Sequence, residues 1–313
     1  MYDRDKILVK ISILFYKENM SKTDIASSLG ISRPTVSALL EEAKANGIVK
    51  ITINHPEAII INQQEQLKKK FNLETVLIAP DSDSLEMVKS EVGYLCSHFI
   101  ENKIDDTYTS IGIGWGSTVY NFVRKASFQD FSQLSIVPLI GGVDVKNTEY
   151  QSNQLVFELG RKYHARTSYF YAPAVAETEN IKFNFTESKF VQEIYMQAKS
   201  VDIAIVSVGR PIEQSTFYKL GYISDEEKKE LIRKKAIGDI LISQIDENGN
   251  EIDSQLTKRM IGLTLADIKQ IKEIVLLAAG VEKSEVLFKL LKQGIIQHLV
   301  IDSSIAERLL EMK

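Results

Sequence analysis

The chain has 313 residues, of which 44% are hydrophobic, and its formal net charge is −4 at pH 7. A chain of this length and apolar content can bury a large core, so we expect one large domain and a smaller one. The nearly balanced charge excludes a generally polybasic protein. Any contact with nucleic acid must therefore come from a local patch.

The single cysteine, Cys96, excludes an intrachain disulfide. The amino-terminal stretch MYDRDKILVK is charged throughout and lacks the apolar core of a signal peptide. No apolar run approaches the roughly 18 residues that cross a bilayer. We therefore expect a cytoplasmic protein that does not engage a membrane.

The segment SKTDIASSLGISRPTVSALLEEAKANGIVKITI, residues 21–53, predicts a helix-turn-helix. Ser21 can cap a short helix, and Asp24 three residues later forms an approximate capping box with it. Gly30 is suited to end that helix in the left-handed conformation. Ser32 is then the cap of a second helix, and Pro34 fits in its first turn, where a missing N–H costs nothing.

Polar side chains in and before the second helix predict a surface that binds double-stranded operator DNA. The first turns of a recognition helix normally meet base edges in the major groove, while short hydroxyl side chains and lysines reach phosphates. An ordinary helical hairpin with solvated polar residues is the alternative. The expected DNA-binding residues are Lys22, Thr23, Ser32, Arg33, Thr35 and Ser37.

The stretch GIVKITI alternates in polarity and predicts a short two-stranded wing that carries Lys50. His55-Pro56 then breaks the pattern, and Ile60, Leu67 and Phe71 indicate one face of a helix. We therefore expect a DNA-binding domain over residues 1–54, a linker and helix over 55–74, and a third segment over 75–313.

From residue 75 onward, apolar runs alternate with helical patterns. The runs are TVLIAP, TSIGIGW, LSIVPLI, TSYFYAP, VDIAIVSVG, EIVLLAAG and HLVID. Near-continuous apolar runs are typical of a mostly parallel sheet covered by helices on both faces, so the fold class is α/β. Ligands of such sheets lie beyond the carboxyl ends of the strands.

The loop IGIGWGSTVY places glycines at 112, 114 and 116 directly before Ser117 and Thr118. Gly114 and Gly116 allow a close approach of the backbone, and the two hydroxyl residues begin a helix, which favours an anion site at its amino terminus. A tight turn without a ligand is the alternative. The G-x-G-x-G spacing matches neither the dinucleotide fingerprint nor the P-loop, so the loop suits a phosphate monoester or a sugar.

Other polar groups follow later apolar runs and are candidates for the same site. Lys283 could neutralise a phosphate, and Asp239 could accept hydrogen bonds from sugar hydroxyls. A solvated lysine and a helix-capping aspartate are the alternatives. The further candidates are Gly141, Gly142, Gln154 and Gly209.

These stretches together resemble the SorC family of bacterial transcriptional regulators, including its deoxyribonucleoside-operon and central glycolytic branches. The motifs are DIASSLGISRPTVSALLEEAKANGIV, GIGWGSTVY, PLIGG, VSVG, KLGYIS, AIGDI and AAGVEKSEVLFKLLKQGIIQHLVID. The resemblance implies a Rossmann-like effector domain over residues 75–313, similar to ribose-5-phosphate isomerase and glucosamine-6-phosphate deaminase. It also implies a phosphorylated sugar as effector and a homo-oligomer, either a dimer or a tetramer.

Carried over by motif, the resemblance assigns the phosphate to Gly116, Ser117 and Thr118 with help from Lys283, and the sugar hydroxyls to Asp239. One departure is Ile140, where some members have a basic residue before the paired glycines. Because Ile140 has no positive charge and no amine, this difference disfavours a sugar diphosphate as the ligand and disfavours its covalent capture as a Schiff base.

Three classes of function remain in view. A sugar-phosphate isomerase or deaminase needs a positioned general base, and Asp239 is the one carboxylate that the motifs place in the site. A repressor that senses NADH lacks an acidic residue for the ribose. We expect a regulator without catalytic residues, metal or cofactor, whose operator binding changes with a sugar phosphate.

Overall fold

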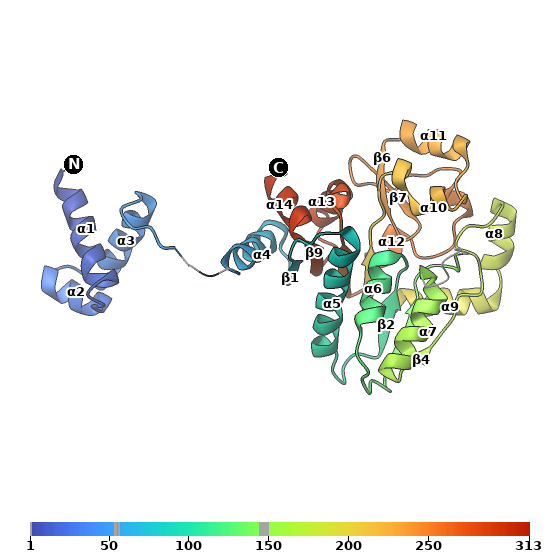
Figure 1. Cartoon of the computed structure of the whole chain (residues 1–313), viewed down its shortest axis with the longest axis horizontal. Coiled ribbons are helices and arrows are strands. Elements are labelled where there is room, and N and C mark those ends of the chain that lie inside the picture. Colours follow the sequence, from blue (N-terminus) through green and yellow to red (C-terminus); the bar gives the residue numbers. More distant parts are fainter. Residues whose placement is uncertain (1, 53–54, 56, 144–149) are drawn as a thin grey trace. The chain divides into compact units, whose positions relative to one another are not determined.

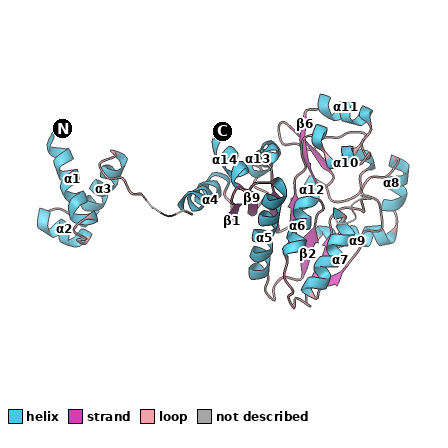
Figure 2. Cartoon of the chain, in the orientation of Figure 1, coloured by secondary structure: helices cyan, strands magenta, loops and turns pink. Residues whose placement is uncertain are grey.

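The computed structural model describes residues 2–52, 55, 57–143 and 150–313 (Figure 1). Contacts divide the chain into two compact units, Met1–Ala58 and Ile59–Lys313. Figure 2 shows helices in the first unit, and both helices and strands in the second. The functional limits expected from the sequence, at residues 54 and 74, stay a prediction.

The first unit consists of three helices, α1 (Tyr2–Tyr16), α2 (Lys22–Leu29) and α3 (Arg33–Ala45). The two helices predicted from the sequence are confirmed, whereas α1 was not foreseen. The Asp24 N–H donates to the Ser21 hydroxyl at 3.2 Å, and Gly30 has φ 66°. Six large aliphatic residues and two alanines form the core: Leu8, Ile11, Ile25, Ala26, Val36, Leu39, Leu40 and Ala43.

The prediction of a wing is wrong for the residues that the structure describes. Residues 46–52 contain turns and bends but no strand, and residue 53 lies outside the described residues. Val49 instead donates its N–H to the Ala43 carbonyl oxygen at 3.1 Å, so the chain folds back on the end of α3. Lys50 is exposed there.

The second unit is built around a parallel sheet of seven strands in the order β1-β9-β8-β5-β2-β3-β4. A separate antiparallel ribbon pairs β6 with β7. The strands are β1 (Thr75–Ala79), β2 (Ser110–Ile113), β3 (Ser135–Pro138), β4 (Arg166–Thr167), β5 (Ile203–Ser207), β6 (Ala236–Ile240), β7 (Ser243–Asp246), β8 (Glu273–Ala278) and β9 (His298–Asp302).

Helices cover this sheet and form its connections. Five of them are short 3-10 or α turns of three or four residues. The helices of the second unit are α4 (Ala58–Phe71), α5 (Leu85–Lys103), α6 (Ser117–Lys125), α7 (Ser152–Tyr163), α8 (Glu179–Thr186), α9 (Lys189–Lys199), η2 (Ile212–Gln214), α10 (Thr216–Lys219), α11 (Asp225–Arg233), η3 (Thr257–Arg259), α12 (Leu265–Ile268), η4 (Val281–Lys283), α13 (Ser284–Lys292) and α14 (Ser303–Glu311).

Alternate residues of the central strands belong to two different cores. In β5, Ala204 and Val206 pack into one cluster and Ile203 and Ile205 into the other. Because side chains alternate across a strand, the two clusters lie on opposite faces of the sheet. The near-continuous apolar runs in the sequence therefore result from burial on both faces, and the predicted α/β class is confirmed.

Two of the strand predictions were inaccurate. The run over residues 167–173 yields only the short strand Arg166–Thr167, and Tyr169–Ala172 form no strand. Asp239 does not follow a parallel strand either, because it lies within β6 of the antiparallel ribbon. The pattern of polar and apolar residues around Asp239 is the same for a ribbon strand as for the end of a central strand, so the sequence alone did not separate the two.

The order of the strands reverses between β2 and β5. From β2 the chain continues outward through β3 and β4, whereas β5, β8 and β9 follow one another in the opposite direction. Such a switch point opens a crevice at the carboxyl ends of the two strands. The loops after Ile113 and Ser207 meet there.

Close contact between α5 and α6 fixes the helix that begins at this crevice. A β-carbon built on Gly93 of α5 would lie 2.5 Å from the Asn121 carbonyl carbon of α6. A glycine is therefore required at this crossing, although alanine is the better helix former.

We predict that Gly93→Ala lowers the free energy of unfolding of the full chain by about 1–3 kcal/mol, because the two helix backbones must separate. Urea unfolding followed by circular dichroism measures the change. The control is Glu91→Ala at an exposed position of the same helix. A Gly93→Ala variant as stable as the control would show that α5 and α6 are not held by this contact.

Candidate anion-binding pocket and nucleic-acid surface

A cavity of about 240 Å³ lies at the switch point between β2 and β5. Segments distant in the sequence contribute to its walls, among them the loops after β2 and β5 and the antiparallel ribbon. The lining residues are Lys89, Trp115, Gly116, Ser117, Thr118, Tyr150, Ser207, Val208, Gly209, Arg210, Gln214, Ser215, Thr216, Phe217, Lys219, Asp239 and Lys283.

The amino terminus of α6 forms one wall. Gly116 is the cap residue with φ 101°, and among the described residues no side-chain cap hydrogen bond is made at this terminus. The hydroxyl of Thr118 is buried, the residue being 1% exposed, and has no hydrogen-bond partner in the described part of the chain. An uncapped helix terminus with an unpaired buried hydroxyl is suited to bind an anion.

Two buried lysines line the same cavity from different helices. Lys89 of α5 forms an ion pair with Glu86, with Nζ 2.6 Å from Oε1. Lys283 precedes α13 and is 7% exposed. Burial, reinforced by repulsion from Arg210, lowers the pKa of the Lys283 ammonium to about 8. An anion in the cavity would stabilise its charged form.

A carboxylate faces these cations from the ribbon. A β-carbon on Gly209 would lie 2.0 Å from Asp239 Oδ2, so the absence of a side chain at Gly209 makes room for the carboxyl group. The Gly209 N–H also donates to the Asp239 carbonyl oxygen at 2.8 Å. Burial raises the pKa of Asp239 to about 7, although the Lys283 charge partly opposes this shift.

The segment after β5 closes the cavity on the remaining side. Arg210 is held by Glu282, with Nε 2.7 Å from Oε1. The ring centroids of Trp115 and Phe217 are 4.5 Å apart, so the loop before α6 contacts α10. Ser215 is buried, and its hydroxyl has no partner among the residues described.

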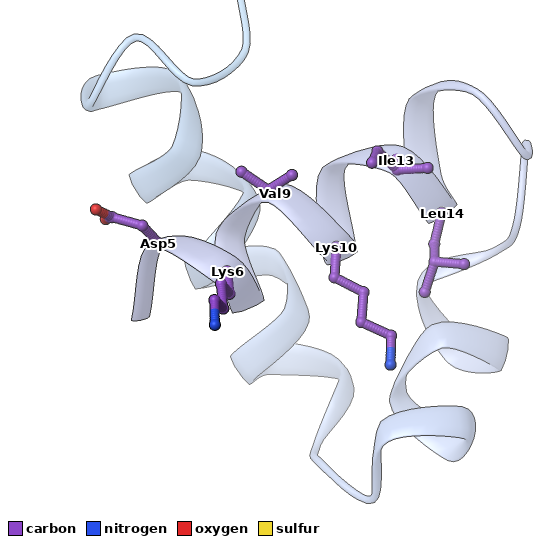
Figure 3. A pocket seen from close by; sticks show the side chains of 6 residues that line it. All are labelled: Asp5, Lys6, Val9, Lys10, Ile13 and Leu14. Carbon is purple, nitrogen blue, oxygen red and sulfur yellow. The ribbon is translucent and has the colours of Figure 1, made fainter. Parts of the chain in front are cut away.

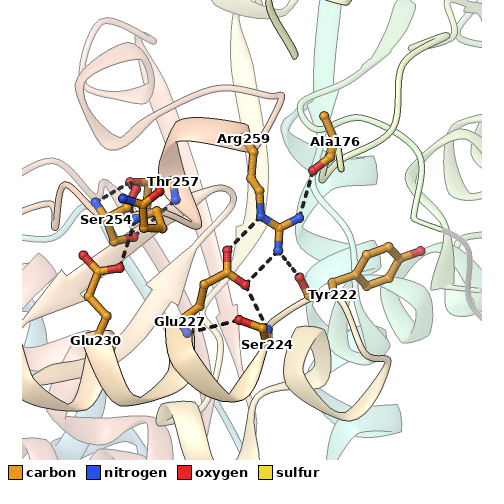
Figure 4. A network of polar contacts seen from close by, with 9 residues as sticks. Ala176, Tyr222, Ser224, Glu227, Glu230, Ser254, Thr257 and Arg259 are labelled. Atoms are coloured by element: carbon orange, nitrogen blue, oxygen red, sulfur yellow. Dashed lines mark hydrogen bonds and ion pairs between the residues drawn. The ribbon is translucent and has the colours of Figure 1, made fainter. Parts of the chain in front are cut away.

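A partly buried ion pair anchors the far end of this closing segment (Figure 4). Arg259 Nε donates to Glu227 Oε1 at 2.8 Å, and Nη2 donates to Oε2 at 2.9 Å. The same guanidinium donates to the carbonyl oxygens of Ala176 and Tyr222. Because Glu227 also forms a capping box with Ser224, the start of α11 is fixed to two neighbouring loops.

Six predicted effector residues line the cavity: Gly116, Ser117, Thr118, Gly209, Asp239 and Lys283. Four others do not. Gly114 and Gly141 pack against backbone atoms of neighbouring segments, Gly142 lines a different surface groove, and the exposed Gln154 donates to Glu158. Ile140 is fully buried in an apolar cluster.

Sequence reasoning missed several lining residues. Trp115 stands inside the glycine motif, and Arg210 directly follows the SVG run, so both could have been inferred from adjacency. Lys89 lies in a helix with no local motif, and only the tertiary contact of α5 with α6 brings it to the cavity.

The predicted DNA-binding residues lie around the amino termini of α2 and α3. Thr23, Arg33 and Thr35 are exposed, while Ser37 is half-buried. Ser32 accepts the Thr35 N–H at 3.2 Å, so its hydroxyl also caps α3. Lys22 lies with its Nζ 5.7 Å from the centre of the Phe15 ring.

Within the described ranges, no helix is long and apolar enough to span a bilayer. Nor do the described residues include a group of three or more histidine, cysteine, aspartate or glutamate side chains placed to hold a metal ion.

Two family models match this chain. The Sugar-bind model, a sugar-binding domain, matches residues 58–311, and a Crp-like helix-turn-helix model matches residues 14–70. The first match covers most of the chain and coincides with the unit that contains the cavity.

Known proteins match this chain over most or nearly all of its length. The deoxyribonucleoside regulator of Bacillus subtilis is 27% identical over 98% of both chains. The full-length sorbitol operon regulator SorC of Klebsiella pneumoniae has a solved structure with TM-score 0.78 and 28% identity, covering 99% of this chain and 100% of that one. A DeoR family transcriptional regulator from Listeria monocytogenes has TM-score 0.73 and 30% identity over 80% of this chain and 98% of its own. The chain therefore belongs to the SorC family of sugar-binding transcriptional regulators, with a helix-turn-helix in its first unit.

Proposed function

We propose that this regulator controls a carbohydrate operon in the cytoplasm and that its operator binding changes when a phosphorylated sugar occupies the cavity at α6. The observation that carries the proposal is the convergence on one cavity of the uncapped α6 terminus, the buried Lys283 and the Thr118 hydroxyl, which has no partner among the described residues.

The charge of the cavity favours an anionic ligand. Its lining includes four cationic side chains, Lys89, Arg210, Lys219 and Lys283, and one carboxylate, Asp239. A phosphate monoester would accept hydrogen bonds from the α6 N–H groups and the Thr118 hydroxyl, and would pair with Lys283. The Thr118 hydroxyl is buried without a hydrogen-bond partner among the described residues, so a ligand that accepts its hydrogen bond would offset a cost of folding.

Asp239 and Ser215 give the cavity a second polar region suited to sugar hydroxyls. Asp239 can accept hydrogen bonds when ionised, and the Ser215 hydroxyl can both donate and accept. Trp115 offers an apolar surface beside them. The proposed ligand is therefore a monosaccharide with one phosphate group.

Two other functions have less support. Its volume of about 240 Å³ is small for NADH, because pockets for drug-sized ligands occupy roughly 300–1,000 Å³. An isomerase-like reaction would use Asp239 as its base, since a pKa of about 7 suits proton transfer. The relatives named above are regulators, and we propose a sensing function without turnover.

The proposed coupling is a linkage between two sites. Operator binding by a helix-turn-helix normally pairs two half-sites, so a homo-oligomer, dimer or tetramer, is part of the proposal. The subunits can adopt one arrangement that binds DNA and another that does not. A sugar phosphate changes DNA affinity only to the extent that it binds one of these arrangements more tightly than the other.

We predict that Arg33→Ala and Lys283→Met separate the two activities. Arg33→Ala should weaken operator binding by about 1–3 kcal/mol, because one base or phosphate contact is lost, and leave sugar phosphate affinity unchanged. Lys283→Met should weaken sugar phosphate binding by at least about tenfold through the lost ion pair.

Operator affinity is measured by fluorescence anisotropy, and ligand affinity by isothermal calorimetry on the same preparations. The operator affinity of ligand-free Lys283→Met is the control, and it should match that of the wild type. Equal loss of both activities in either variant would contradict the division of labour.

We predict that Asp239→Asn stabilises the ligand-free protein in a manner that depends on pH. The pKa of the Asp239 carboxyl group is raised from its ordinary value of 3.8 to about 7 in the folded protein. Such a group does not destabilise the protein at a pH below 3.8, and it destabilises the protein fully at a pH above 7. The gain in free energy of unfolding should therefore grow between pH 4 and 7 and level off at about 4 kcal/mol.

Urea unfolding at pH 4.5, 6 and 8.5 measures this gain. The same variant should bind the sugar phosphate more weakly at pH 8.5, because a carboxylate acceptor is lost. A gain that is constant with pH would show that Asp239 ionises as easily in the folded protein as in the unfolded chain.

A further inference from the structure

Hollows away from the cavity at α6 differ in how they are enclosed. One is a groove along α1, and all the residues that line it belong to that single helix (Figure 3). Another, of about 460 Å³, lies in the second unit, where α8 and α9 meet residues 260–264 and the turn of the antiparallel ribbon. We call it the α9 cavity. Because several separate segments form its walls, it is the better candidate for a second ligand site.

Most of the α9 cavity is apolar. Four of its side chains are at most 5% exposed: Val191, Ile242, Met260 and Ile261. Tyr195 adds its ring, since its hydroxyl donates to Asp267. Small organic ligands normally occupy pockets of roughly 300–1,000 Å³ with such a lining and a few polar groups. The α9 cavity therefore has the size and the surface to hold an aliphatic chain.

One cation lines this apolar space. The Lys182 side chain is half-buried, and Nζ lies 3.4 Å from the Thr257 carbonyl oxygen, with no carboxylate in ion-pair contact among the described residues. Burial lowers the pKa of Lys182, and the charge of Glu179 partly opposes this shift. No acidic residue is among the described residues that line the cavity. An anionic group on an apolar ligand would therefore stabilise the charged form of Lys182.

The acid next to this site is already neutralised. Asp267, which accepts the Tyr195 hydroxyl, pairs with Lys199, with Nζ 2.9 Å from Oδ1. It also accepts hydrogen bonds from Thr264 at the start of α12. Its charge is thus balanced by groups of its own, and Lys182 is the cation left for a ligand.

The α9 cavity and the cavity at α6 have no lining residue in common among those described. The antiparallel ribbon nevertheless contributes to both, because Asp239 of β6 lines one and Ile242, three residues later, lines the other. Access to the α9 cavity is open at its rim, where Met196 is 64% exposed. The two sites can therefore be filled independently.

We propose that the α9 cavity binds a medium-chain aliphatic carboxylate. The chain packs against Val191, Ile242 and Met260, and the carboxylate pairs with Lys182. A ligand held in this way also contacts the ribbon that carries Asp239. The regulator thus has a second small-molecule site, which does not depend on the proposed sugar phosphate.

Isothermal calorimetry of the full chain with octanoate is the first test. We expect one octanoate per chain, and roughly fourfold tighter binding for each methylene added between hexanoate and octanoate, because each is removed from water. Octylamine has the same chain with the opposite charge. It should bind at least about tenfold more weakly than octanoate, because Lys182 repels it.

Two variants locate the site. Lys182→Met should weaken octanoate binding by about fivefold or more and leave the binding of octanol unchanged, because only the charge pair is lost. Gln192→Glu places a negative charge at an exposed position of the lining and should also weaken octanoate binding. The matched control is Lys189→Met, which removes an exposed lysine of α9 outside the lining and should keep the wild-type affinity.

Absence of octanoate binding to the wild type overturns the proposal, and so does an affinity that is the same in Gln192→Glu as in the wild type. Circular dichroism checks that Lys182→Met is folded, and Gln192→Glu alters only an exposed side chain, so the test stands on either variant. Lys283→Met should bind octanoate like the wild type. A failure of the sugar phosphate site is therefore distinguished from a failure of the α9 cavity.

Discussion

The second unit is organised around polar groups that it buries without pairing them. Thr118 and Ser215 have buried hydroxyls with no partner among the described residues, and the first turn of α6 has no side-chain cap. Lys283 and Asp239 are buried in the same cavity. Desolvation lowers the pKa of Lys283 to about 8 and raises the pKa of Asp239 to about 7. Such groups cost free energy in a ligand-free protein, and a ligand with complementary charge and hydroxyls offsets this cost.

The sheet explains why these groups meet. Reversal of strand order between β2 and β5 opens a crevice at their carboxyl ends, and the close contact of Gly93 with α6 fixes the helix that starts there. The antiparallel ribbon adds Asp239 over Gly209, where no side chain could be accommodated. The cavity is thus a consequence of the topology, with its chemistry supplied by a few side chains.

Much of this arrangement could be predicted from the sequence. Caps, a glycine turn and a proline start are local signals, and they located α2 and α3. Burial on both faces gave the central strands their apolar runs. The glycine loop indicated Gly116, Ser117 and Thr118, because an anion site at a helix terminus is also local.

The errors concern features that depend on tertiary contacts. A wing was predicted from alternation alone, but Val49 folds back onto α3. Lys89 reaches the cavity through helix packing, which no motif records, and Gln154 turns to Glu158 on its own helix. Asp239 was expected in the site, although its position within a ribbon strand was not foreseen.

The most direct measurement is thermal unfolding of the full chain with a panel of sugars, sugar monophosphates and NADH, followed by product analysis in the same samples. A ligand that binds only the folded state adds about 2.7 kcal/mol at a hundred times its dissociation constant. Our account predicts that a sugar monophosphate raises the unfolding temperature, that its unphosphorylated sugar raises it less, and that neither is converted. Stabilisation by NADH alone, or turnover of the sugar phosphate, would contradict it.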